Sequence, residues 1–201
     1  VDQFNKLLDE QRFAEAEVAV CWDTPRGIYS EMPRLQLIHS IAARVDNVVD
    51  GQDTRGLPVC RVVDPLLAEG MLQFVLWSVL HFHRGLDVAM KNQRERFWQR
   101  PKQTPAATCR VGLMGLGKLG GRIAQLLPTL GYSVNGWSRS EKEIEGVTVF
   151  SGEAALADFL GCTDILVCLL PLTHSTRGIL NRSTFEALPA GAAIVNCGRG
   201  E

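Results

Sequence analysis

The chain has 201 residues, of which 46% are hydrophobic, so it is long enough for one large domain or two small ones with buried cores. Its 21 lysine and arginine residues nearly balance its 22 aspartate and glutamate residues, which excludes a net field that recruits nucleic acid or an anionic membrane surface. The longest apolar stretch, MLQFVLWSVLHFH, is shorter than the ~20 residues that a spanning helix needs and contains polar side chains, so we predict no membrane span.

The start of the chain and its cysteines indicate the cellular compartment of the protein. No secretory leader opens the sequence, which begins at Val1, and we expect the gene to start further upstream. The six cysteines form no CxxC pair, and most lie in apolar runs where a thiol behaves as a small buried hydrophobe. This pattern predicts a reduced, cytoplasmic protein without a metal site.

The first segment has helical spacing in FNKLLDEQRFAEA and then three short apolar runs, EVAVCW, LQLIHSIA and PVCRVV. Runs that are apolar throughout are typical of strands buried on both faces, which favours a parallel sheet with helical crossovers. Such a sheet usually opens on a strand. Because this segment opens on a helix, we expect its first strand to lie upstream of Val1.

A long helix is predicted next. Asp64 can cap it, and Pro65 fits its first turn. Apolar residues recur at helical spacing toward Trp98, and Gly85 predicts a kink or break. The prolines of RPKQTPAAT then end the helix and begin a linker.

Aromatic side chains gather on this predicted helix without the interleaved basic residues of a nucleic-acid platform. They are Phe74, Trp77, Phe82, Phe97 and Trp98. His81 and His83 stand two residues apart, so they point to different faces and cannot form a metal pair of the i, i+4 kind. We interpret these residues as core or partner-helix contacts and expect a homodimer.

From Cys109 onward, strand and helix patterns alternate strictly. The predicted strands are RVGLMG, SVNGWS, VTVF, DILVCLL and AAIVNCG. Helices are predicted near residues 118–130 and 152–160, with one or two short ones between Ser175 and Leu188. This alternation predicts right-handed βαβ units in a doubly wound sheet. The expected fold class is α/β, with two Rossmann-like or flavodoxin-like parallel-sheet domains, both incomplete in this chain.

The most specific functional motif is GLGKLG, a GxGxxG run placed directly after a predicted strand and directly before a predicted helix. Gly115 permits the tight turn, Gly117 lets the backbone approach a pyrophosphate and Gly120 lets the helix pack closely. The helix start at Lys118 and Leu119 offers free N–H groups to the anion. Because strand, turn and helix agree, we predict a dinucleotide site rather than a glycine-rich turn without a ligand.

The next strand ends in Ser138, Arg139 and Ser140, where an NAD-selective site carries an acidic residue for the ribose 2′-hydroxyl. A guanidinium and two hydroxyls suit a 2′-phosphate. We therefore predict that NADPH (NADP) is the preferred cofactor and that NADH is a possible one. The alternative is a solvated loop arginine, because Glu141 and Glu145 are close enough in sequence to pair with it.

A further loop falls at the edge where ligands lie in an open α/β sheet. Leu170 and Pro171 end one predicted strand, and Ser175 or Thr176 opens a helix after them. We count Leu170, Pro171 and Thr176 as candidate cofactor contacts. His174 in this loop is more typical of a solvated histidine than of a catalytic acid, since nothing nearby in sequence orients its ring.

The last apolar strand ends at the same edge with Cys197, Gly198 and Arg199. The first two are further candidate cofactor contacts. An arginine there can reach a bound anion or carbonyl and keeps its charge at any working pH. From the residues alone, a surface arginine is an equally good interpretation of Arg199.

In order and spacing, VGLMGLGKLG, GWSRS, DILVCLLPLTHSTRGIL and LPAGAAIVNCGRG resemble the D-2-hydroxyacid dehydrogenase family, and within it the glyoxylate/hydroxypyruvate reductase A branch. The upstream segments VCWDTP, RLQLIHSIAARVDNVV and RVVDPLLAEGM agree. The resemblance implies a partial substrate domain at residues 1–100, which ends in the long helix, and a partial NAD(P)-binding Rossmann domain at residues 101–201.

The resemblance also implies the reduction of a small 2-oxoacid, such as glyoxylate or hydroxypyruvate, with NADPH. Arg199 matches the family's arginine that holds the substrate carboxylate and polarises its ketone, so it is the candidate catalytic residue. A histidine that donates the proton and a carboxylate that tunes it lie downstream of this arginine in the family. We therefore expect the chain to be truncated at both ends and to have little turnover alone.

One loop departs from the family pattern. The family usually reads Gly-Ala-Gly-Val-Asp where it presents backbone N–H groups to the substrate carboxylate, whereas this chain has Ala42, Ala43 and Arg44 before Val45 and Asp46. The loss of two glycines narrows the allowed backbone conformations. Arg44 can either serve a dianionic or larger acid or block the loop.

An alternative of a different class is a non-catalytic NAD(P)-sensing or corepressor-like protein, because a corepressor branch shares the family fold and fold does not dictate function. A β-hydroxyacid dehydrogenase has a similar glycine motif. Its cofactor domain starts the chain, whereas about a hundred residues precede the motif here, which argues against that option.

Overall fold

A computed structural model describes residues 12–198, in which two parallel sheets belong to two separate units. We expected the domain boundary near residue 100. The units divide instead between Pro65 and Leu66, because the long helix that follows packs into the core of the second sheet. The assignment of substrate and cofactor functions to the two units stays a prediction.

The first unit is a three-stranded parallel sheet in the order β1-β2-β3. Its elements are η1 (Arg12–Glu15), β1 (Val18–Cys21), η2 (Ile28–Glu31), β2 (Leu37–Ser40), α2 (Asp46–Val49) and β3 (Val59–Arg61). The three predicted strands are confirmed, whereas most of the predicted opening helix lies outside the described residues. Ile38 and Val48 are fully buried, and the buried Tyr29 hydroxyl donates to the Val48 carbonyl at 2.9 Å. This core holds the segment after β2 against the sheet.

Gly85 breaks the predicted long helix into α3 (Pro65–His83) and α4 (Leu86–Arg94). Its φ of 64° lies in the left-handed region that glycine adopts at little steric cost. Val75 and Val79 of α3 are fully buried in the core of the second unit. By length and composition alone α3 could also cross a membrane, with 17% of its apolar window buried, but a core helix meets the same test. The predicted absence of a span therefore stays a prediction.

His83 ties the end of α3 to the rest of the second unit. Its Nε2 lies 2.9 Å from the Thr104 carbonyl oxygen, which can only accept, so this nitrogen carries a proton. In the neutral ring, Nδ1 then accepts from the Tyr132 hydroxyl at 2.9 Å. His83 is thus a packing residue. Within residues 12–198, no group of three His, Cys, Asp or Glu side chains is placed to hold a metal.

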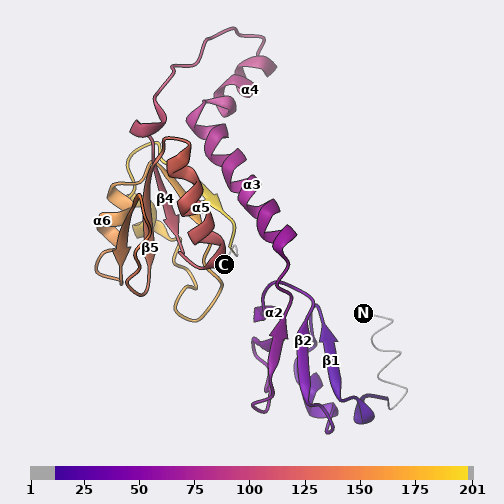
Figure 1. Cartoon of the computed structure of the whole chain (residues 1–201). Coiled ribbons are helices and arrows are strands. Elements are labelled where there is room, and N and C mark those ends of the chain that lie inside the picture. The colour runs from indigo at the N-terminus through magenta and orange to yellow at the C-terminus, as the bar shows by residue number, and fades with distance from the viewer. Residues whose placement is uncertain (1–11, 199–201) are drawn as a thin grey trace. The chain divides into compact units, whose positions relative to one another are not determined.

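The second unit is a five-stranded parallel sheet in the order β6-β5-β4-β7-β8, which confirms the predicted doubly wound architecture. Its strands are β4 (Arg110–Met114), β5 (Ser133–Ser138), β6 (Val147–Ser151), β7 (Ile165–Cys168) and β8 (Ala193–Asn196). Its helices are η3 (Ala106–Thr108), α5 (Lys118–Thr129), α6 (Leu156–Gly161) and α7 (Arg182–Glu186). Figure 1 shows α5 and α6 on opposite sides of this sheet. Alternate residues of β4 divide accordingly, since Val111 and Leu113 pack with α5 and Met114 packs with α6.

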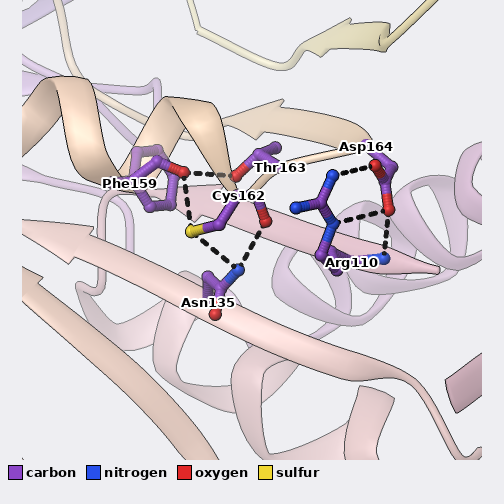
Figure 2. Close-up of polar contacts among 6 residues, drawn as sticks. All are labelled: Arg110, Asn135, Phe159, Cys162, Thr163 and Asp164. Atoms are coloured by element: carbon purple, nitrogen blue, oxygen red, sulfur yellow. Dashed lines mark hydrogen bonds and ion pairs between the residues drawn. The ribbon is translucent and has the colours of Figure 1, made fainter. Parts of the chain in front are cut away.

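Side-chain hydrogen bonds join strands β4 and β5 to the segment before β7 at the amino edge of this sheet (Figure 2). Arg110 donates from Nε to Asp164 Oδ2 at 3.0 Å, from Nη2 to Oδ1 at 2.5 Å and from its backbone N–H to Oδ2 at 2.8 Å. Asn135 of β5 donates from Nδ2 to the Cys162 carbonyl at 2.8 Å. The polar groups at the amino edge are therefore occupied by hydrogen bonds within the protein, while the glycine turn lies at the carboxyl edge.

Candidate functional site

The glycine turn joins β4 to α5, and the surroundings of its three glycines differ. Gly115 has a φ of 109°, and a Cβ there would lie 3.1 Å from Leu170 Cδ2. Gly117 has open space where its Cβ would be. A Cβ on Gly120 would collide with the Gly115 carbonyl oxygen, so only glycine lets α5 start so close to the turn. This is the shape that a pyrophosphate cradle needs.

The start of α5 is open toward this cradle. Its N-cap residue is Gly117, and no side chain caps the helix there. Lys118 is exposed and Leu119 is half-buried. The first N–H groups of a helix have no intrahelical partner, and a twelve-residue helix adds the positive end of its dipole. The residues present therefore fit the pyrophosphate of a dinucleotide.

The loop after β5 holds the residues predicted to select the cofactor. Ser138 is buried, and its Oγ donates to the Ser140 carbonyl at 2.6 Å, so its proton is already used within the loop. Arg139 and Ser140 are exposed. In the described part of the chain, Arg139 forms no ion pair with Glu141 or Glu145. The guanidinium is thus available to a ligand.

The loop after β7 contributes to a cavity of about 290 Å³ at the carboxyl ends of β7 and β8. Leu170, Pro171 and Thr176 lie in its wall. The predicted helix start at Ser175 or Thr176 is wrong, because only turns follow until α7. The cause is local: Thr176 Oγ1 donates to the Pro171 carbonyl at 2.5 Å and accepts from the Thr173 N–H at 2.8 Å.

Strand β8 brings two further candidates to the same edge. The Cys197 N–H donates to the Cys168 carbonyl at 2.9 Å, and burial raises the pKa of the Cys197 thiol, which keeps it protonated near neutral pH. The Gly198 N–H donates to Asn196 Oδ1 at 2.9 Å, and a Cβ on Gly198 would lie 2.8 Å from a backbone oxygen of the loop after β7. Arg199, the predicted catalytic residue, lies outside the described residues.

The predicted substrate loop follows β2 in the first unit, so it does not share a sheet edge with the cofactor candidates. The Ala42 N–H donates to Ser40 Oγ at 3.1 Å and is therefore occupied. The N–H groups of Ala43 and Arg44 form no hydrogen bond with other residues between 12 and 198. The Arg44 guanidinium lies beside Asp46, with 3.5 Å between Nε and Oδ1. Two N–H groups of this loop are thus available to a ligand.

Arg61 also contacts this loop, although no sequence motif indicated it. It ends β3, the neighbour of β2, and its Nη1 donates to the Ala43 carbonyl at 2.8 Å. In a trans peptide the C=O and the following N–H point in opposite directions, so this bond also sets the direction of the Arg44 N–H. The sequence signal that could have indicated Arg61 is its position at the carboxyl end of a strand that neighbours β2.

Replacing Arg61 with methionine should loosen the loop without unfolding the sheet. One hydrogen bond from an exposed charged donor contributes about 1 kcal/mol, which corresponds to about fivefold faster exchange of the hydrogen-bonded amides of Ala42 and of Val62, whose N–H donates to the Ala42 carbonyl. Hydrogen–deuterium exchange measures this rate. Arg34→Met removes an exposed pair with Glu17 and serves as the control. Equal exchange at Ala42 and Val62 in the two variants would show that Arg61 does not hold the loop.

Comparison with known proteins assigns this chain to a family. The sequence model described as D-isomer specific 2-hydroxyacid dehydrogenase, NAD binding domain, matches residues 76–201. The chain belongs to the D-2-hydroxyacid dehydrogenase family. The family that the motifs indicated is therefore confirmed, and the matched segment contains the whole glycine turn and the second sheet.

Individual members of the D-2-hydroxyacid dehydrogenase family cover most of the chain. Glyoxylate/hydroxypyruvate reductase A from Yersinia enterocolitica is 35% identical over 193 aligned residues, which cover 92% of this chain and 61% of that protein. The crystal structure of a D-isomer specific 2-hydroxyacid dehydrogenase family protein from Klebsiella pneumoniae 342 is 47% identical, with a TM-score of 0.89, and the match covers 96% of this chain and 62% of that one.

A third D-2-hydroxyacid dehydrogenase is the NADPH-dependent glyoxylate/hydroxypyruvate reductase from Sinorhizobium meliloti, solved in complex with NADP and sulfate. It is 36% identical, with a TM-score of 0.83, and the match covers 96% of this chain and 64% of that one. The chain thus spans about three fifths of the length of these relatives. Two of the three carry the name of the branch that the sequence resembles.

Proposed function

We propose that the protein carrying this chain reduces a small 2-oxoacid of the glyoxylate or hydroxypyruvate type to the D-2-hydroxyacid with NADPH. The observation that carries this proposal is the glycine turn, with its open helix start and its close packing at Gly120, in a chain of the D-2-hydroxyacid dehydrogenase family. A reduced nicotinamide cofactor, when bound, supplies the hydride. The relative from Sinorhizobium meliloti is described as an NADPH-dependent reductase, which supports the same reaction here.

A preference for NADPH over NADH is supported by the loop after β5. No carboxylate ends this strand, and the exposed Arg139 guanidinium has no ion-pair partner in the described part of the chain. Arginine offers a fork of donors that matches phosphate oxygens. Arg139 therefore contacts the 2′-phosphate, with Ser140 beside it, and Ser138 shapes the loop through its own hydrogen bond.

In this proposal the substrate is held by a charged side chain and by neutral backbone N–H groups. Arg199 binds the carboxylate and polarises the ketone, because its planar fork serves two oxygens and stabilises the negative charge that develops during reduction. The N–H groups of Ala43 and Arg44 bind the carboxylate as neutral donors. The Arg44 guanidinium in the same loop lies beside the Asp46 carboxylate, which compensates its positive charge.

We also propose a cytoplasmic homodimer. The side chains of Phe74 and Trp77 on α3 are 48% and 56% exposed, although the opposite face of this helix is core. Apolar surface of this kind favours coverage by a partner. All six cysteines are free, which suits a reducing compartment.

In the complete gene product, glyoxylate reduction is expected to have a kcat/KM at least about tenfold higher with NADPH than with NADH, since a charge-assisted hydrogen bond to the 2′-phosphate contributes about 1.5 kcal/mol or more. The loss of nicotinamide absorbance measures both rates. Chiral chromatography of the product formed from hydroxypyruvate tests its D configuration, because the glycolate formed from glyoxylate has no stereocentre. Equal rates with the two cofactors would contradict the NADPH preference. Tight NADPH binding without turnover would favour the sensing protein instead.

A further inference from the structure

Lys142 reaches from the loop after β5 back to the glycine turn after β4. Its Nζ donates to the Leu116 carbonyl oxygen at 3.0 Å, and 26 positions separate the two residues in sequence. Leu116 is only 4% exposed, and its carbonyl receives no other hydrogen bond from residues 12–198. An exposed lysine is therefore held at one point of the turn.

The charge of Lys142 is not matched by a nearby carboxylate. Glu141, Glu143 and Glu145 surround it in sequence, yet none of them forms an ion pair with it in the structure of residues 12–198. A lysine held in one geometry loses rotamer entropy, and one hydrogen bond to a neutral carbonyl compensates only weakly. A positive charge fixed in this way gains most when a ligand brings negative charge to it.

The position of this ammonium relative to the fold indicates which part of a ligand it meets. In a doubly wound dinucleotide domain, the adenosine ribose lies between the first βα turn and the end of the following strand. Here Leu116 belongs to that turn and Lys142 follows that strand. The two elements are in direct contact, since the Gly115 N–H donates to the Trp137 carbonyl at 2.9 Å and a Cβ on Gly136 would lie 2.7 Å from Leu116 Cδ1.

We propose that Lys142 is a second cation of the 2′-phosphate subsite and a determinant of NADP(H) specificity. This inference rests on the proposed NADPH preference and adds to Arg139 a residue that the glycine turn itself holds. An ammonium has three N–H donors, of which one serves Leu116 and two remain for phosphate oxygens. Arg139 supplies a planar fork, and Lys142 supplies a compact point charge.

Adenosine fragments test this role with the 201-residue chain, because 2′,5′-ADP differs from 5′-AMP only in its 2′-phosphate. In calorimetric titrations, the wild type should favour 2′,5′-ADP by about tenfold or more. Lys142→Met should reduce this preference about fivefold at an unchanged affinity for 5′-AMP, and Lys142→Arg should keep most of it. Lys91→Met, at an exposed lysine of α4, removes the same charge elsewhere and should alter neither affinity.

Two outcomes separate the role of Lys142 from the proposed function on which it rests. If Lys142→Met keeps the wild-type preference while Arg139→Met loses it, the subsite exists without Lys142 and the inference is wrong. If the wild type binds both fragments equally, the NADPH preference and the inference are both wrong. Unchanged thermal unfolding of Lys142→Met would confirm that a reduced preference reflects a lost ligand contact.

Discussion

A Gly120→Ala variant is expected to bind NADPH about a hundredfold more weakly than the wild type. The added Cβ would collide with the Gly115 carbonyl oxygen, which is backbone and cannot rotate away. The helix must then move off the turn, and the N–H groups at its start lose their aim at the pyrophosphate. Two hydrogen bonds to a charged group, at about 1.5 kcal/mol each, account for the loss. Overpacking should also lower the free energy of unfolding by about 1 to 3 kcal/mol.

Gly121→Ala provides the comparison, because the next residue of the same helix has open space where its Cβ would lie. Alanine there should raise stability by about 0.5 to 1 kcal/mol and leave NADPH binding unchanged. Nucleotide fluorescence titration measures binding, and urea unfolding followed by tryptophan fluorescence, to which the buried Trp137 contributes, measures stability. If Gly120→Ala behaves like Gly121→Ala, α5 does not need its close approach to the turn.

Asp164→Asn should lower the free energy of unfolding of the second unit by about 1 to 2 kcal/mol at neutral pH. The carboxylate accepts three hydrogen bonds from Arg110 (Figure 2), and bonds to charged groups are the stronger kind. Solvent screening reduces their sum, because the Arg110 and Asp164 side chains are 38% and 33% exposed. Glu186→Gln removes the much more exposed pair with Arg182 on α7 and should cost no more than about 0.5 kcal/mol.

The stabilisation by Asp164 should depend on pH in a defined direction. Hydrogen bonds from the Arg110 guanidinium lower the pKa of Asp164 in the folded protein below its unfolded value of about 3.9. A carboxyl with a lowered pKa stabilises the fold above the unfolded pKa, and this contribution is lost as the pH falls through the folded pKa. The stability difference between wild type and Asp164→Asn should therefore be constant near neutral pH and shrink below about pH 4. Urea unfolding at several pH values checks this, and a difference that does not decrease at all below about pH 4 would contradict it.

The strands of the second sheet could be predicted closely from the sequence. Strand β5 has the predicted bounds, Ser133–Ser138, and the apolar run ILVC of β7 is buried at all four positions, as expected for a strand covered on both faces. The break at Gly85 could also be predicted, since glycine adopts a left-handed φ at little steric cost. The glycine turn belongs to the same class, because the φ of Gly115 and the close contact between Gly120 and Gly115 are local. These features follow from short-range rules.

Contacts between distant residues could not be predicted in this way. Neither Arg61 nor Lys142 has a local signature, because each donates to a backbone carbonyl, a group that every residue carries. The helix expected near Thr176 fails for a related reason. The Thr176 hydroxyl donates to the Pro171 carbonyl and closes a turn there, and the spacing of apolar residues carries no information on such a hydrogen bond. The cofactor candidates nevertheless gather at one edge, since parallel strands bring their carboxyl ends together.

The amino edge of the second sheet has a consequence for how the nucleotide preference of this domain can change. The ties from Arg110 to Asp164 and from Asn135 to Cys162 lie at the opposite ends of the strands from the glycine turn. Substitutions at residues 139–142 remove none of these ties. Laboratory evolution is therefore expected to change the preferred nucleotide through residues at the carboxyl edge without loss of thermal stability. The hydrogen bonds that stabilise the sheet lie at its amino edge and stay in place.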